Sequence, residues 1–272
     1  MRVLECDFMR QLIGHTFSTL RKRQGIHVKE LTAGIISESE YYRFVNGTID
    51  ISMVKFLLLL SRLNISFEEF AFLSENIDVS KPLTHFSKGK SVSLNNATNF
   101  KLSITFYQSH AQIPPKPVIE KSISYLLDSE SWTYDDLLLF SKTIYFFPCK
   151  QRLALLQRAI KGFKKYNGFK QNIADYFKFL CQLLLIAWDR KDLKLAKKFM
   201  HQLLEMRFHP NDFFELSLQS FFKAVLLYLS EPTDNNRFQI RTIVESFKHL
   251  NLLQGESSLL IKASLSYLEL SI

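Results

Sequence analysis

Residues 27–52 read HVKELTAGIISESEYYRFVNGTIDIS, and this stretch decides the fold that the sequence predicts. It holds two short helical segments, one closed by Gly34 and one beginning at Ser37, joined by a tight turn. Ser37 is a good helix N-cap, and Glu40 follows it at the spacing of a capping box. Two short helices with this spacing are typical of a helix-turn-helix unit, whose second helix lies in the major groove of DNA.

Three further helices are predicted around this unit. One precedes it and ends at Gly25, and two follow it, beginning at Ser52 and at Ser66. The preceding helix carries apolar residues at helical spacing, namely Leu12, Ile13, Phe17 and Leu20. The sequence therefore predicts a five-helix helix-turn-helix domain over residues 1–76.

The composition favours an all-α protein. The 272 residues include only 8 glycines and 7 prolines, too few for the many turns of a strand-rich fold. Three scattered cysteines without a CxxC spacing argue against a disulfide framework and against a zinc site. Every apolar run is shorter than the roughly 18 residues of a membrane span, and the acidic residues near the N-terminus do not fit a signal peptide. We therefore expect a cytoplasmic protein with no membrane segment, metal or cofactor.

The excess of positive charge lies outside the helix-turn-helix domain. Residues 1–75 contain nine Lys or Arg and nine Asp or Glu, whereas residues 76–272 contain 26 basic and 17 acidic residues. Any attraction of the first domain to DNA must therefore come from a local face and not from its net charge.

Residues 117–272 are predicted to form consecutive helices, and alternate helices begin about every 36 to 42 residues. That period is typical of a right-handed solenoid of tetratricopeptide-like helical hairpins. The segment 77–116 is predicted to be a linker or a first helical hairpin, because the alternation of apolar residues over 100–107 fits either a strand or a helix. The predicted helices span 117–128, 134–147, 150–166, 170–189, 192–206, 211–230, 235–250 and 256–271.

Two stretches resemble the Rgg/GadR/MutR family of Gram-positive transcriptional regulators. The first is SESEYYRFVNGTIDIS over residues 37–52, with the segment LNISFEEF over 63–70. The second is WTYDDLLLF over 132–140, which is similar to the segment that opens the regulatory domain in that family. The resemblance implies a dimeric regulator whose helical domain binds a short hydrophobic peptide on its concave face.

The resemblance also implies which residues touch double-stranded DNA. Arg43 is the main candidate, because a guanidinium can bind a phosphate or the O6/N7 edge of guanine. Asn46 can bond to a phosphate or to an adenine edge. His27 and Lys29 begin the preceding helix, where a cation and free N–H groups suit a phosphate. The remaining candidates are the first residues of the recognition helix, Ser37, Glu38, Ser39 and Glu40.

The peptide-binding candidates are predicted from the helical period. If alternate helices line a groove, the helices 170–189 and 211–230 each present one stripe to it. Amide side chains can pair with a peptide backbone, and a lysine can pair with its carboxylate. The predicted set is Asn172, Tyr176, Phe179, Gln219, Phe222 and Lys223.

The sequence contains no constellation typical of an enzyme. It lacks a glycine-rich phosphate loop, a GxSxG motif and an HExxH motif. Acid pairs such as Glu68-Glu69 begin predicted helices, where the helix dipole explains them. We therefore expect a regulator and not an enzyme. The alternative is a helical-repeat scaffold whose first domain binds protein, which the zero net charge and the two glutamates of the recognition helix favour.

Overall fold

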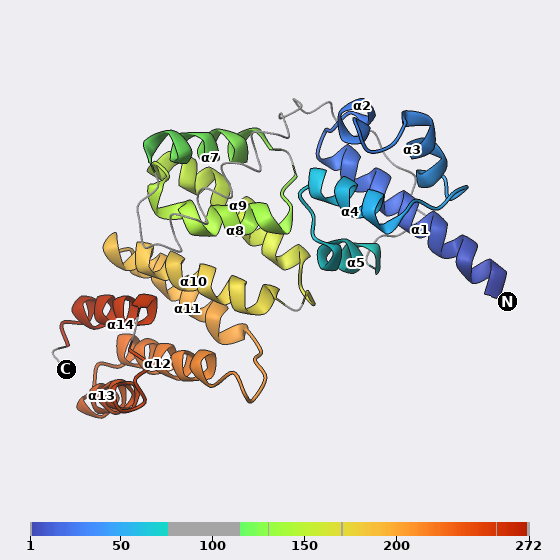
Figure 1. Cartoon of the computed structure of the whole chain (residues 1–272). Helices are drawn as coiled ribbons and strands as arrows, with labels where there is room; N and C mark the ends of the chain where they lie inside the picture. Colours follow the sequence, from blue (N-terminus) through green and yellow to red (C-terminus); the bar gives the residue numbers. More distant parts are fainter. Residues whose placement is uncertain (1, 76–114, 130, 170, 254, 271–272) are drawn as a thin grey trace. The chain divides into compact units, whose positions relative to one another are not determined.

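The computed structural model describes residues 2–75, 115–129, 131–169, 171–253 and 255–270. Every regular element in these ranges is a helix, as Figure 1 shows, so the predicted all-α class is confirmed. The chain forms two compact units, residues 1–169 and 170–272. Apart from residues 115 and 116, the segment predicted to be a linker or first hairpin lies outside the described residues.

The first unit begins with the five predicted helices. Ser37 and Ser52 cap two of them, each accepting a hydrogen bond from the backbone N–H three residues ahead, at 3.1 and 3.3 Å. Gly34 and Gly47 have positive φ values, which allow the chain to turn sharply before and after the helix that Ser37 caps. The helices are α1 (Arg2–Arg23), α2 (Val28–Thr32), α3 (Glu38–Val45), α4 (Met53–Arg62) and α5 (Phe67–Glu75).

Phe17 of α1 is the centre of the core of this five-helix bundle. Its ring is fully buried and lies 5.7 Å from Phe44 of α3 and 6.0 Å from Phe56 of α4, measured between ring centroids. At Gly14 of α1, a Cβ atom would lie 2.5 Å from the carbonyl oxygen of Val45 in α3. A residue without a side chain at position 14 therefore lets α1 approach the backbone of α3.

The rest of the first unit consists of α7 (Lys116–Asp128), α8 (Tyr134–Thr143), the short 3₁₀ helix η1 (Ile144–Phe146) and α9 (Cys149–Lys165). A capping box begins α8: the carboxylate of Asp136 accepts the backbone N–H of Thr133 at 2.8 Å, and the hydroxyl of Thr133 accepts the backbone N–H of Asp136 at 3.3 Å. Trp132 donates its indole N–H to the carbonyl of Leu126 at 3.2 Å and packs 5.3 Å from the ring of Phe140. Residues 132–140 thus cap the start of α8 and pack its first turns into the core.

The second unit consists of α10 (Asn172–Asp189), α11 (Leu193–Glu205), α12 (Phe213–Ser230), α13 (Asp234–His249) and α14 (Gly255–Tyr267). Each helix packs on the next from α10 to α13, and α14 packs on α10, where Trp188 and Tyr267 place their rings 4.5 Å apart. The core holds large side chains that are no more than 1% exposed, namely Phe179, Phe199, Phe221 and Phe222. The predicted succession of helices is confirmed.

Among the described residues, α12 is the one helix that is long and apolar enough to cross a bilayer. Its Leu218, Phe221, Phe222 and Val225 are buried, and it packs on α11 and α13. Only 28% of its residues are buried, and Phe213 and Leu227 are exposed on its other sides.

The five-helix bundle and the helices α7 to α9 form one compact unit. The division of the chain into domains over 1–76 and 117–272 stays a prediction. The unit is joined by packing that no local pattern reveals: Phe72 of α5 stacks on Tyr166 with ring centroids 6.0 Å apart, and it also contacts Phe169 at 5.5 Å.

Candidate functional site

The outward face of α3 is the candidate recognition surface. Tyr41 and Phe44 point inward and are 1% and 6% exposed, which fixes the rotation of the helix. The opposite face carries side chains that the structure leaves exposed, namely Glu38, Ser39, Tyr42 and Arg43. Ser37 and Asn46, at the two ends of the helix, are exposed as well. Among the DNA contacts predicted for α3 and its ends, Glu40 is half-buried and the others are exposed, and their contact with DNA stays a prediction.

Arg43 is exposed, in the last turn of α3. Its carbonyl accepts bonds from the backbone N–H and the hydroxyl of Thr48, at 2.9 and 2.8 Å, which hold the chain as it leaves the helix. Within the described part of the chain, no hydrogen bond or ion pair engages its guanidinium. This arrangement suits a side chain that binds a phosphate or a base edge.

The two glutamates of α3, Glu38 and Glu40, have different environments. Lys55, in the first turn of α4, donates to the carboxylate of Glu40 at 2.8 Å, and both groups are half-buried. Glu38 is exposed to solvent. An intramolecular cation thus offsets one of the two negative charges that would repel a phosphate, and this pairing could not be inferred from the spacing of the two residues.

Tyr42 is a surface residue that the sequence analysis missed. Its side chain is 52% exposed although it is large and aromatic, and its ring packs edge-on against Tyr41 at 5.6 Å. A helical projection places it beside Ser39, three residues earlier. Its position next to Arg43 gives the face a hydroxyl and an aromatic surface for contact with a backbone or a thymine methyl group.

The basic residues before α3 divide into structural and free groups. Arg21 donates to the hydroxyl of Tyr41 at 2.9 Å and to the carbonyl of Ile26 at 2.6 Å, so it braces the bundle. His27 and Lys29 are exposed at the start of α2, and the His27 side chain makes no capping bond to that helix. These two predicted phosphate contacts therefore share the exposed surface of the bundle with α3.

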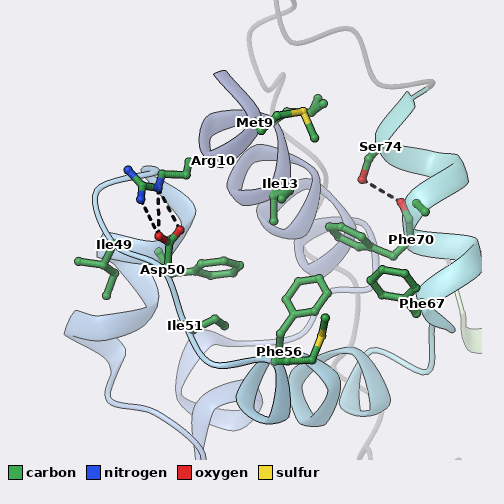
Figure 2. A pocket seen from close by; sticks show the side chains of 14 residues that line it. Met9, Arg10, Ile13, Ile49, Asp50, Ile51, Phe56, Phe67, Phe70 and Ser74 are labelled. Atoms are coloured by element: carbon green, nitrogen blue, oxygen red, sulfur yellow. Dashed lines mark hydrogen bonds and ion pairs between the residues drawn. The ribbon is translucent and has the colours of Figure 1, made fainter. Parts of the chain in front are cut away.

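An apolar pocket of about 570 Å³ lies on the other side of α3. Figure 2 shows Ile13 of α1, Phe56 of α4 and Phe70 of α5 around it, with Arg10 and Asp50 paired at the rim. The guanidinium of Arg10 donates to the carboxylate of Asp50 at 2.7 to 3.2 Å, and this contact lowers the pKa of Asp50. The pocket therefore offers an apolar surface with one ion pair beside it.

The predicted peptide contacts do not form a single surface. Phe179 and Phe222 are fully buried, and Asn172 is 4% exposed. Gln219 donates its amide to the carbonyls of Leu203 and Met206, at 2.6 and 2.9 Å, and so caps the end of α11. In the structure these four residues therefore serve the core or a cap, contrary to the predicted groove.

Two members of that set face outward. Lys223 is exposed, and Tyr176 is half-buried, with a pKa raised by its burial and by the neighbouring charge of Glu205. The other four lie on sides of α10 and α12 that neighbouring helices cover, and an apolar stripe in the sequence does not reveal which side is concave. Among the described residues, no group of three or more His, Cys, Asp or Glu could hold a metal ion.

The fold and the exposed face of α3 define a class: a helix-turn-helix bundle followed by helical hairpins. The sequence model of the C-terminal domain of the HTH-type transcriptional regulator Rgg matches residues 85–259. Since this match spans more than half of the chain, the protein belongs to the Rgg family of transcriptional regulators.

One solved structure shows a similar fold, and two others match with TM-scores below 0.5. A protein of Listeria monocytogenes EGD-e assigned as a transcriptional regulator matches with a TM-score of 0.52 and 16% identity, over 96% of this chain and all of that one. The SHP pheromone receptor Rgg2 of Streptococcus dysgalactiae matches with a TM-score of 0.46 and 19% identity, over 94% of this chain and 99% of that one. Bacillus thuringiensis PlcR, solved with the peptide PapR7 and DNA, matches with a TM-score of 0.35 and 17% identity, over 96% of this chain and 89% of that one.

Proposed function

We propose that this protein is a dimeric transcriptional regulator that binds a specific double-stranded DNA site through α3. One observation carries the proposal: α3 turns Tyr42 and Arg43 outward beside Ser39, while its inner face anchors it in the bundle. A rigid helix with an unengaged guanidinium is what direct reading of a major groove needs. Two copies would read two half-sites one helical turn apart.

The test begins with selection of bound fragments from a random pool of double-stranded DNA at low salt. Affinity for the selected site is then measured by fluorescence anisotropy. We expect Arg43→Ala to weaken binding about 10- to 100-fold, as loss of one base or phosphate contact predicts. Arg207→Ala removes the same charge from an exposed position outside the bundle and should leave affinity within about 2-fold. Equal affinity of Arg43→Ala and the wild type would refute the assignment of α3, and analytical ultracentrifugation tests the dimer.

We further propose that the second unit senses a short hydrophobic peptide, as membership of the Rgg family and the resemblance described above imply. Of the predicted contacts, Lys223 is exposed on its surface and Tyr176 is half-buried. Calorimetric titration with peptides encoded by short reading frames beside the gene tests this directly. Lys223→Ala should reduce affinity, and Lys178→Ala, also on an exposed position, should not. Equal loss in both variants would indicate attraction by net charge alone.

A second candidate function is protein docking by the five-helix bundle. Its α4 exposes apolar side chains, with Met53 at 60%, Val54 at 68%, Leu57 at 45% and Leu58 at 49% exposure. Contiguous apolar surface of this kind marks interaction sites in soluble proteins. The DNA selection separates the two functions, because a scaffold would retain no fragment even at low salt.

A further inference from the structure

One carboxyl group is buried where the five-helix bundle meets the hairpin of α8 and α9. Glu69, in the first turn of α5, is 2% exposed. Its Oε1 atom accepts the backbone N–H of Tyr134 at 2.9 Å and the hydroxyl of Tyr166 at 2.5 Å. These partners lie 65 and 97 residues further along the chain, so the carboxyl group joins three helices that are far apart in sequence.

Aromatic rings surround this carboxyl group. The ring of Tyr134 lies 5.2 Å from that of Tyr166 and 4.8 Å from that of Phe169, and Phe72 stacks on Tyr166. Tyr166 and Tyr134 are 1% and 3% exposed, so little water reaches the site. A charge in such a place is costly unless it is fully compensated.

Both hydrogen bonds are accepted by Oε1 of Glu69, so the Oε2 atom can be protonated without breaking either bond. A neutral carboxyl group protonated on Oε2 still accepts both bonds on Oε1. Protonation therefore removes the buried charge without breaking either contact. Ionisation keeps the contacts but introduces a charge among aromatic rings.

The charged and titratable groups around Glu69 come from each neighbouring helix. Asp135 opposes ionisation of Glu69 and Lys165 favours it, while Asp136 and Arg23 act on the partner Tyr166. Burial is the largest influence and raises the pKa of Glu69 to about 7, although the bonds from Tyr166 and Tyr134 favour the charged form. The proton is therefore exchanged near neutral pH.

We propose that Glu69 is a proton-controlled latch between the five-helix bundle and the α8–α9 hairpin, closed when its carboxyl group is neutral and weakened when it is ionised. The latch connects the helices that carry the candidate recognition surface to the part of the chain that the Rgg domain model covers. Its effect on DNA binding rests on the proposed function, but the latch itself does not.

The experiment measures amide hydrogen exchange of α5 and α8 in the full-length protein at pH 6 and pH 8, corrected for intrinsic exchange rates. If opening exposes Glu69 to water, the opening constant should rise about tenfold between these pH values, because the open form loses its proton at a lower pH. Glu69→Gln retains an oxygen that accepts both bonds and has no charge to lose, so its opening constant should not change with pH. Exchange in α13 provides an internal reference.

Glu68→Gln is the matched control, because Glu68 precedes Glu69 in the same turn and is exposed. It should retain the tenfold response. Tyr166→Phe removes one bond that favours the charged form, so it should shift the response to higher pH, and it tests the latch even if Glu69→Gln folds poorly. A wild-type opening constant that does not vary with pH, or a Glu69→Gln response equal to that of the wild type, would overturn the proposal.

DNA affinity at the same pH values is a separate measurement. If hydrogen exchange in α5 and α8 changes with pH but the protein binds no DNA at either pH, the proposed function is refuted and the latch is not. A DNA-binding protein with no pH response in α5 and α8 would refute the latch alone.

Discussion

Glu40 and Glu69 have the same side chain in the same bundle, yet their surroundings give them different chemistry. Glu40 lies near the surface against Lys55, where an ion pair contributes little to folding but shapes the local field. Glu69 lies among aromatic rings, where burial controls its protonation. The sequence predicted a helix-dipole role for the acids that begin α5. It could not show that Glu69 turns toward residues 65 and 97 positions away.

The pairing of Glu40 predicts a compensating pair of substitutions. Lys55→Gln leaves the carboxylate of Glu40 unpaired on the recognition helix, so DNA affinity should fall about 3- to 10-fold at low salt, in line with about 1 kcal/mol for such a pair. Adding Glu40→Gln should restore the affinity, and anisotropy at two salt concentrations measures both effects. If Lys55 instead contacts DNA directly, the second substitution will restore nothing.

At the scale of elements, the positions of the helices could be predicted from caps and from the apolar period. The neighbours that cover each helix could not. The predicted 117–128 and 235–250 correspond to α7 (Lys116–Asp128) and α13 (Asp234–His249), because prolines, caps and glycines mark helix ends locally. The faces of α10 were misjudged, since Phe177, Phe179 and Leu184 are all buried and surround much of the helix. Only the packing of neighbouring helices shows which side is free.

Substitution should destabilise the bundle at two glycines for different reasons. Gly14 lies where α1 contacts α3, and Gly34 has a positive φ. Gly14→Ala places a Cβ atom 2.5 Å from the backbone oxygen of Val45, so the helices must separate, at a cost of about 1–3 kcal/mol. At Gly34 nothing lies within 4 Å, but φ is +72°, so Gly34→Ala should cost only about 1–2 kcal/mol through backbone strain. Urea unfolding measures both. Gly34→Asn, which tolerates a positive φ, should recover stability, whereas no side chain should be tolerated at Gly14.

At the scale of the whole molecule, the contacts between residues far apart in the chain were the feature least accessible from sequence. Charge and period separate a helix-turn-helix domain from a helical domain, but the contacts of Glu69 and Phe72 join the bundle to α8 and α9 in one compact unit. Contacts between distant residues carry no local signature, so neither the junction nor its buried acid could be predicted from spacing.

Because Glu69 is buried at that junction, the free energy of unfolding of the first unit should decrease as pH rises. The pKa of Glu69 is raised to about 7 in the folded protein from 4.5, so the folded state holds the proton more tightly than the unfolded chain. The free energy of unfolding should therefore fall as pH rises from about 5 to 8 and level off above, by roughly 2–3 kcal/mol for this group. Urea unfolding at several pH values should show this fall in the wild type and in Glu68→Gln. Subtracting the free energy of unfolding of Glu69→Gln at each pH isolates the contribution of Glu69. If this difference stays constant, or grows in favour of the wild type as pH rises, the charge of the buried carboxylate is fully compensated.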